Sequence, residues 1–203
     1  MAESIWDLSL QNALDQTASA APTPGGGSIA AVSASFGLGL VIMALEVSVK
    51  KQPAAAAAIT QGRKLLAVLT PFVDRDVAVF GAYMEALRLP KQTEAEQAAR
   101  DAARAAASLE AARTPLQAAE ACLRALSFAH SSARHVHKNV WSDLLAGSDL
   151  LMGSIKAVLR TVDINLPMLQ DETARQQIAD RAANLEHEAT LVYARIAGLE
   201  PVN

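Results

Sequence analysis

The chain is poor in aromatic residues and has a single cysteine. Of its 203 residues, 4% are aromatic, and the one cysteine is Cys122. A lone cysteine cannot form a disulfide within the chain, which favours a reducing compartment. Cys122 lies in an apolar run with helical spacing, so we expect it to be a core residue.

The sequence also lacks a large excess of charge of either sign. Its net charge is −3, and it contains no block of basic residues. A protein that binds nucleic acid through the phosphate backbone normally carries a basic patch. We therefore expect no nucleic-acid partner.

We expect neither a signal peptide nor a membrane span. The first residues, MAESIWD, are acidic and lack a long apolar core, so we expect a cytoplasmic protein. The one membrane-like stretch, residues 29–45, has no charged residue. It is at the short limit for crossing a bilayer, and serines and glycines interrupt it. We interpret this run as a buried helix and expect no membrane contact.

No segment alternates apolar and polar residues for long enough to predict a strand, and apolar residues make up 51% of an alanine-rich chain. The pattern predicts an all-α fold, with residues 1–203 forming a single domain of about six to seven helices. Small residues in the uncharged run would let other helices approach closely, which places that helix at the centre of a bundle. The helices are expected at about 4–19, 28–50, from 53 with a kink or a boundary at Pro71, from 93, 114–130, 142–165 and through 178–196.

Local signals set several of these boundaries. Thr93 and Glu96 form a capping box, and Glu96 is spaced to pair with Arg100. Thr114 followed by Pro115 is typical of a helix start, with a cap and a first-turn proline. Ser142 is expected to cap the helix that ends near Asn165.

Asp76 is a carboxylate on an otherwise apolar helical stripe. The stripe consists of residues at helical spacings, Leu65, Leu69, Phe72, Phe80, Tyr83 and Leu87. A carboxylate there would lose hydration, which disfavours its charged form and suits it to exchange protons near neutral pH. Its neighbours Asp74 and Arg75 point elsewhere. The alternative is a structural aspartate that caps a helix or pairs with a cation such as Arg75.

Gly25, Gly26, Gly27 and Ser28 form a glycine-rich turn directly before the uncharged helix. Such a turn can present backbone N–H groups and the positive end of the helix dipole to an anion or a carbonyl oxygen. It matches neither the P-loop pattern nor a dinucleotide-binding fingerprint. The alternative is a tight connection without a ligand.

The histidines do not indicate a metal site. His135 and His137 are two positions apart, so they face different ways on a helix, and no HExxH motif occurs. The sequence likewise has no GxSxG motif for a serine nucleophile. We expect neither a metal nor a cofactor.

Several segments together resemble a known family. They are TPGGGSIAA, the Asp74-Arg75-Asp76 step followed by Phe80, RLPK at 88–91, TPLQAAEAC, KNVWSD and DINL. Their order and spacing are similar to those of the formimidoyltetrahydrofolate cyclodeaminase and methenyltetrahydrofolate cyclohydrolase family. The resemblance covers almost the whole chain.

This resemblance implies an all-α homodimer that binds a folate-type substrate in a cleft beside the glycine turn. Asp76 matches the catalytic aspartate, which would act as a general acid and base. The resemblance also implies nine substrate-binding residues, Gly25, Gly26, Gly27, Ser28, Lys91, Asn139, Ser142, Asp143 and Asn165. The last four would form a second cluster nearby. The reaction would be methenyltetrahydrofolate cyclohydrolysis or formimidoyltetrahydrofolate cyclodeamination, and the absence of a fused formiminotransferase domain favours the first.

The chain departs from the family pattern at three places. Glu46 stands where relatives tend to have Asn, the basic stretch after that helix is reduced to Lys50 and Lys51, and Thr161 replaces an Asn. Glu46 would add charge close to the cleft, and the missing lysines would weaken binding of the glutamate tail of folate. A non-catalytic helical dimer that binds a small molecule or a protein is the alternative function.

Overall fold

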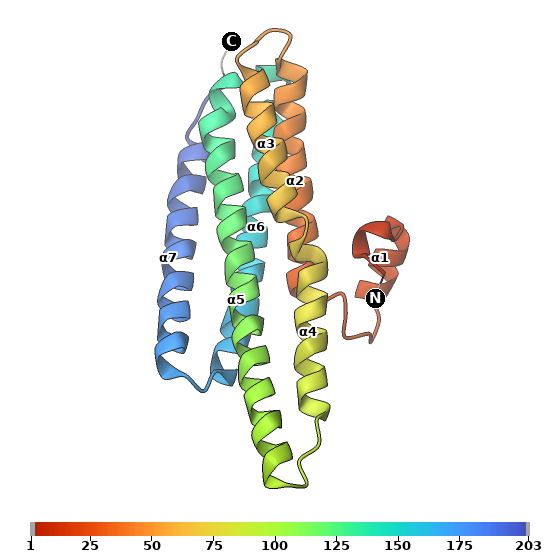
Figure 1. Cartoon of the computed structure of the whole chain (residues 1–203). Helices are drawn as coiled ribbons and strands as arrows, with labels where there is room; N and C mark the ends of the chain where they lie inside the picture. The colour runs from red at the N-terminus through yellow and green to blue at the C-terminus, as the bar shows by residue number, and fades with distance from the viewer. Residues whose placement is uncertain (1–2, 202–203) are drawn as a thin grey trace.

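The computed structural model describes residues 3–201, and within that range it is all-helical without an extended strand, as the sequence predicts. Figure 1 shows long helices lying side by side, with the short α1 standing to one side of them. The helices are α1 (Leu10–Thr17), α2 (Gly26–Ser48), α3 (Ala55–Leu69), α4 (Phe72–Arg88), α5 (Glu94–Ser132), α6 (Trp141–Asn165) and α7 (Glu172–Ala197).

Helix α2 is the central helix that its small residues predict. A Cβ atom added at Gly37 would lie 2.8 Å from the carbonyl oxygen of Gly147 in α6, so the two backbones touch. By length and composition α2 is apolar enough to cross a membrane, yet 61% of its most apolar 18-residue window is buried within the bundle. Around it lies one hydrophobic cluster with buried residues from α2, α3, α5, α6 and α7.

Pro71 separates α3 from α4. The sequence predicted either a kink or a helix boundary here. The structure has a boundary, because α3 ends at Leu69 and α4 begins at Phe72. Proline has no N–H to continue the hydrogen-bond ladder, which explains the break. In Figure 1, α4 continues in roughly the direction of α3.

Helix α5 begins as predicted, with the reciprocal capping box of Thr93 and Glu96. The predicted pair between Glu96 and Arg100 is wrong, because the Glu96 carboxylate is used by the cap. Arg100 instead donates from Nη2 to the Leu87 carbonyl of α4, at 3.1 Å. This bond joins the two helices near the α4–α5 turn.

The predicted helix start at Thr114 is also wrong. Helix α5 runs without interruption from Glu94 to Ser132, with Pro115 inside it. Pro115 has no N–H to offer the carbonyl of Ala111, but Asn165 Nδ2 of α6 donates to that oxygen at 2.7 Å. A partner from another helix replaces the missing bond, so α5 continues through the proline.

Helix α6 starts at Trp141 with Val140 as its N-cap residue and no side-chain capping bond, so the predicted Ser142 cap is wrong. Its predicted end at Asn165 is confirmed. The last helix is confirmed as well, and Asp171 caps its start. Its predicted seam is buried at Ile178, Ala182, Leu185, Ala189 and Ile196.

The predicted first helix, residues 4–19, consists of two pieces. Ile5–Asp7 forms a short 3-10 turn and α1 follows, with Ser4 and Ser9 as their respective caps. The second serine starts a new helix because its side chain accepts from the Asn12 N–H.

Candidate active site

Asp76 of α4 caps the start of α2. The N-cap residue Gly25 has no side chain that can accept a hydrogen bond. Asp76 Oδ2 takes that role and accepts from the backbone N–H of Ser28, at 3.0 Å, and from the Ser28 hydroxyl, at 2.9 Å. Two donors and the positive end of the α2 dipole therefore fix the carboxylate in place.

Gly27 makes this contact possible. A Cβ atom added at Gly27 would lie 2.7 Å from the carboxyl carbon of Asp76. Real Cβ atoms do not approach other heavy atoms so closely, so the carboxylate lies directly on the glycine backbone. Here glycine is needed for close approach.

Asp76 is half-buried, and its surroundings are less apolar than the stripe predicted, because Ser28 supplies two donors. Its other oxygen, Oδ1, accepts no hydrogen bond from the described residues. The capping alternative is therefore real, and one carboxylate oxygen is left without a hydrogen bond from the described residues.

A cavity of about 350 Å³ adjoins this carboxylate. Residues of α2, α4, α5 and α6 line it, together with the segment before α2 and the turn after α6. The lining residues are Pro22, Thr23, Gly25, Gly26, Gly27, Asp76, Val79, Phe80, Tyr83, Ala111, Thr114, Pro115, Thr161, Ile164, Asn165 and Met168. A mostly apolar cavity with a few polar groups is typical of a small-molecule site.

The two neighbours of Asp76 point elsewhere, as predicted. Asp74 accepts at Oδ1 from the backbone N–H of Ile5, at 2.9 Å, and so holds the N-terminal segment against α4. Arg75 lies 3.7 Å from Glu110 of α5. Asp76 alone of the three faces the cavity.

Ser28 and Lys91 are among the predicted substrate-binding residues that do not line this cavity. Ser28 is fully buried, and both its donors are used by Asp76, so its role is to position the carboxylate. Lys91 is exposed in the turn between α4 and α5, beyond the end of α4. The glycines at 25–27 and Asn165 do line the cavity.

The predicted second cluster does not form within one chain. Asn139, Ser142 and Asp143 lie around the start of α6, whereas Asn165 ends it. At about 1.5 Å per residue, Ser142 and Asn165 are about 34 Å apart. The long straight helix separates residues that the family resemblance grouped together.

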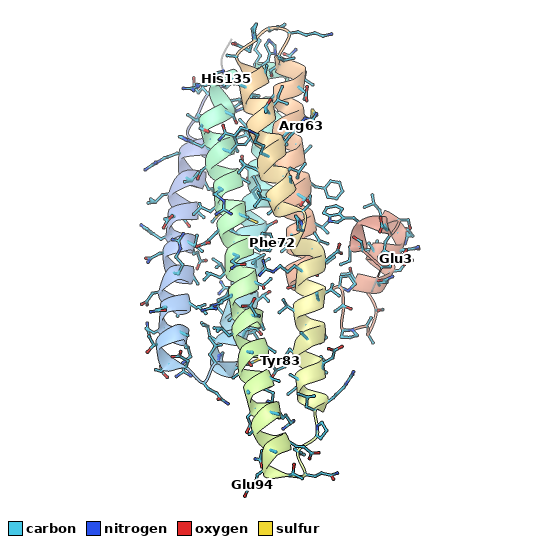
Figure 2. All side chains as sticks on the ribbon, in the orientation of Figure 1. Glu3, Arg63, Phe72, Tyr83, Glu94 and His135 are labelled. Carbon is cyan, nitrogen blue, oxygen red and sulfur yellow. The ribbon has the colours of Figure 1, made fainter. Side chains whose placement is uncertain are left out.

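Glu46 is also far from the cavity within one chain, which corrects the expectation that it adds charge there. It lies 19 positions beyond Gly27 on α2, about 28 Å at the helical rise, and it pairs with Arg63 at 2.7 Å. Figure 2 shows Arg63 towards one end of the bundle and Tyr83 towards the other.

Lys50 and Lys51 lie at this same end, just beyond α2. Lys51 Nζ is 3.0 Å from His137 Nε2. Loss of hydration, and then the charges of Lys51 and Lys138, lower the pKa of His137. Of the three departures from the family pattern, only Thr161 lines the cavity.

No metal-binding cluster is found between residues 3 and 201, where no three His, Cys, Asp or Glu side chains are grouped to hold an ion. Cys122 is fully buried, as predicted, and burial raises the pKa of its thiol to about 12. A protonated, buried thiol is a poor nucleophile and a poor metal ligand.

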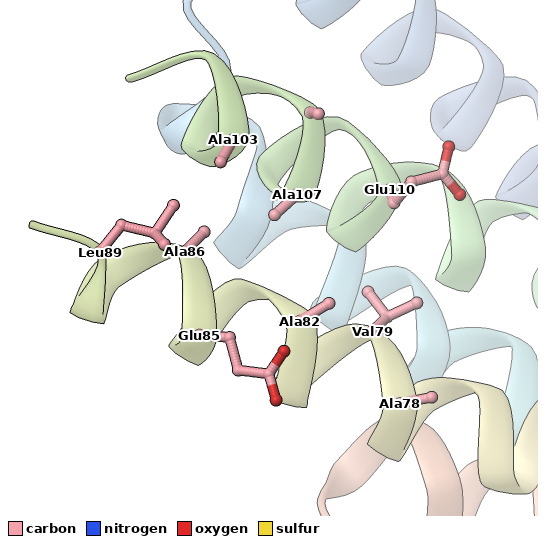
Figure 3. A pocket seen from close by; sticks show the side chains of 10 residues that line it. Ala78, Val79, Ala82, Glu85, Ala86, Leu89, Ala103, Ala107 and Glu110 are labelled. Atoms are coloured by element: carbon pink, nitrogen blue, oxygen red, sulfur yellow. The ribbon is translucent and has the colours of Figure 1, made fainter. Parts of the chain in front are cut away.

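A second, larger cavity lies between α4 and α5, on the part of this hairpin that extends away from α2 (Figure 3). Its volume is about 580 Å³, and alanines line most of it. Glu85 and Glu110 are its only charged lining residues among those described, and neither Asp76 nor the glycine turn reaches it. We therefore place the candidate site at the smaller cavity.

Sequence reasoning missed several residues of the site. Phe80 and Tyr83 share the stripe of Asp76, so the spacing that singled out the aspartate also places them beside it. Thr114 gave no such signal, because its pattern indicated a helix start. Ile164 and Met168 are large apolar residues at the mouth of the cavity, exposed by 68% and 40%.

The fold is similar to that of a protein of known structure. The crystal structure of formiminotetrahydrofolate cyclodeaminase from Thermotoga maritima superposes with a TM-score of 0.83, over 95% of this chain and 96% of that one, at 24% sequence identity.

Sequence comparison identifies the family. The family described as formiminotransferase-cyclodeaminase matches residues 9–184, and the chain belongs to it. Methenyltetrahydrofolate cyclohydrolase of Methylorubrum extorquens is 31% identical over 193 residues, which are 92% of this chain and 93% of that protein. Formimidoyltransferase-cyclodeaminase of Mus musculus is 27% identical over 97% of this chain, but the match spans only 37% of the mouse protein.

Proposed function

We propose that this chain is a folate one-carbon enzyme that opens or closes the 5,10-methenyl bridge of tetrahydrofolate. The observation that carries the proposal is the Asp76 carboxylate, held by Ser28 at the glycine turn with one oxygen unbonded beside the cavity. Family membership and the names of the relatives support the same class of enzyme. The cyclohydrolase is favoured, since that relative matches over nearly its whole length.

In the cyclohydrolase reaction, Asp76 acts as a general base and then as a general acid. Water attacks the methenyl carbon, and Asp76 takes a proton from it as the new C–O bond forms. The bond from this carbon to one ring nitrogen then breaks, and Asp76 returns the proton to that nitrogen. The hydroxyl group on the carbon gives its own proton to solvent as it becomes the formyl C=O. The carboxylate also faces a cationic, amidinium-like substrate, which its charge stabilises.

In the cyclodeaminase reaction the same group moves the same proton. N10 attacks the formimino carbon and loses a proton to Asp76, and the departing nitrogen receives a proton before ammonia leaves. Neither reaction changes an oxidation state, and one carboxyl group can move the protons of both, so we propose that the enzyme uses neither a cofactor nor a metal.

The cavity suits a flat heterocycle. Phe80 and Tyr83 lie on one face of α4 beside Asp76, and both line the cavity. Aromatic side chains stack on flat rings, while Ile164 and Met168 border an open mouth through which the rest of a folate can extend.

The first test is the Asp76→Asn variant. Asparagine can still accept from Ser28, so we expect the fold and melting temperature to change little. Loss of general acid and base catalysis should lower the turnover of 5,10-methenyltetrahydrofolate by about 100-fold to 10,000-fold. Turnover is followed as the decay of the near-ultraviolet absorbance of the substrate.

Asp74→Asn is the matched control. It removes a carboxylate that is on the same helix but faces away from the cavity. It should keep the parent rate. Equal rates for Asp76→Asn and the parent would refute the catalytic role. A parent that binds no folate at millimolar concentration would favour the alternative, a non-catalytic helical dimer with another small-molecule or protein ligand.

A panel of formimino, methenyl and formyl derivatives of tetrahydrofolate decides between the two reactions. Ammonia release from the formimino substrate identifies the cyclodeaminase. Absorbance loss with the methenyl substrate alone identifies the cyclohydrolase, which is the result we expect.

We also propose a homodimer in the cytoplasm, with no nucleic-acid or membrane partner. Large apolar side chains on the outer faces of the packed pair α2 and α6 support the dimer; Phe36 is 51% exposed, Val47 54% and Leu150 40%. Burying such side chains against a second copy would remove apolar surface from water.

A further inference from the structure

One buried hydroxyl group of the cavity has no hydrogen-bond partner. Thr114 of α5 is only 2% exposed and lines the same cavity as Asp76 and Asn165. Its Oγ1 makes no hydrogen bond within the described residues. Buried polar groups are normally paired, so this exception needs a physical reason.

Three buried serines of α2 and α6 have paired hydroxyl groups. Ser35, Ser48 and Ser148 each donate to the carbonyl four residues earlier. Thr114 makes no such bond to Glu110. Among the described residues, the other buried side-chain atoms without a partner are Arg100 Nε and Arg104 Nε of α5, so Thr114 carries the one unpaired hydroxyl of this group. It is also the one of these three residues that lines the cavity.

Pro115 fixes a second polar group beside it. Because proline lacks an N–H, the carbonyl of Ala111 is free to accept from Asn165 Nδ2, at 2.7 Å. A carbonyl oxygen only accepts, so the amide nitrogen must be the atom that faces Ala111. Asn165 Oδ1 therefore points away from Ala111, and it accepts no hydrogen bond from residues 3–201.

We infer that Thr114 is a substrate-binding residue that acts together with Asn165 Oδ1. This inference rests on the proposed function. The pair offers a hydroxyl donor on α5 and a fixed acceptor on α6 in the lining of one cavity, which suits a ring edge where an N–H lies beside a carbonyl. The pyrimidine ring of a pterin carries such an edge, so the hydroxyl donates to the ring carbonyl and Oδ1 accepts from the ring N–H.

The arrangement separates recognition from chemistry. Asp76 belongs to α4 and contacts the start of α2, whereas Thr114 belongs to α5 and Asn165 to α6. A ligand held at one side by the hydroxyl and the amide would present its one-carbon unit to the carboxylate. Losing the hydroxyl should therefore weaken binding more than it slows the bound substrate.

The test uses Thr114→Val, which keeps the shape of the side chain and removes the hydroxyl. We expect KM for 5,10-methenyltetrahydrofolate, and Kd for 5-formyltetrahydrofolate measured by calorimetry, to rise about tenfold, with kcat within about twofold of the parent. The melting temperature should be equal to the parent's or higher, because an unpaired buried hydroxyl has been removed.

Two further variants complete the test. Thr114→Ser keeps the hydroxyl and should restore KM and Kd to within about threefold of the parent. Thr190→Val removes an exposed hydroxyl of α7 that donates to the Glu186 carbonyl, and it should change neither constant.

The outcomes distinguish the inference from the proposed function. An active parent with unchanged KM and Kd in Thr114→Val overturns the inference alone. A fall of several degrees in the melting temperature of that variant also overturns it, since the hydroxyl would then have a structural partner. A parent that neither binds nor converts these folates overturns the proposed function and this inference together.

Discussion

Asp76 joins the first turn of α2 to α4 through one carboxylate oxygen. The sequence allowed either a structural cap or a proton-transferring acid at this position, and the structure shows that the two roles are compatible. Oδ2 accepts both donors of Ser28, while Oδ1 remains unbonded beside the cavity. The position of the carboxylate is thus fixed by the same contact that starts the central helix.

A residue-scale prediction concerns Gly27→Ala. The new Cβ atom would lie 2.7 Å from the Asp76 carboxyl carbon, so the carboxylate or the helix start must move. We expect the free energy of unfolding to fall by about 1–3 kcal/mol, as in other overpacked sites. Turnover of 5,10-methenyltetrahydrofolate should fall by about 100-fold, because a small displacement of a catalytic group is costly.

Gly39→Ala provides the matched control on the same helix. Nothing lies within 4 Å of a Cβ atom added there, and the residue is outside the cavity. Denaturant unfolding and turnover of this variant should match the parent or show a slight gain in stability. A Gly27→Ala variant as active as the parent would show that the close approach is not needed.

At the scale of helices, α5 shows why a local signal failed. Thr114 followed by Pro115 has the pattern of a helix start, and the residue that lets the helix continue, Asn165, lies fifty positions later in the chain. No local pattern contains that partner.

The apolar periodicity and the composition of the sequence correctly predicted two of the long helices. The uncharged run became α2, and the apolar seam of α7 is buried. Asp76 was found because a carboxylate broke an apolar stripe, and Phe80 and Tyr83 could have been found from the same stripe. The grouping of Ser142 with Asn165 does not form within one chain, because these residues lie at the two ends of one long helix.

Pro115→Ala gives the prediction for this element. An N–H at position 115 can bond to the Ala111 carbonyl and compete with Asn165, while the helix loses its unfavourable proline. We expect the melting temperature to rise by about 2–8 °C. KM for 5,10-methenyltetrahydrofolate should rise by about threefold to tenfold, since Asn165 loses its anchor.

Pro53→Ala is the control, because Pro53 lies in the turn before α3. It should raise neither the melting temperature nor KM. A more stable Pro115→Ala variant with the parent KM would show that Asn165 is oriented without help from the proline.

At the scale of the whole molecule, the residues that the family resemblance implies fall into two groups at opposite ends of α6. One group surrounds the cavity, and the other contains Asn139, Ser142 and Asp143. A single chain cannot bring them together, but a second copy running in the opposite direction can. The proposed homodimer would then build each site from both chains.

Mixing two inactive variants tests this arrangement. We expect Asp76→Asn and Asp143→Asn each to be inactive alone, and we expect a refolded equal mixture to recover about a quarter of the parent activity. Half of the dimers would be mixed, and each would hold one intact site of two. Sedimentation should give the mass of a dimer.

A monomer mass at working concentration would contradict the dimer. A dimer without recovery after mixing would contradict the shared site and leave the Asp76 proposal in place. Full activity of Asp143→Asn alone would show that the second group has no part in the reaction.

The contact between Ser28 and Asp76 also supplies a spectroscopic reporter. The backbone N–H of Ser28 donates to the carboxylate oxygen of Asp76, so its nitrogen and proton chemical shifts depend on the charge and the contacts of that carboxylate. Titration with a folate should move this one cross-peak, while amides in the middle of α7 stay still. A single isotope-labelled sample would thus follow occupancy of the cavity without a dye, a coupled enzyme or any alteration of the chain.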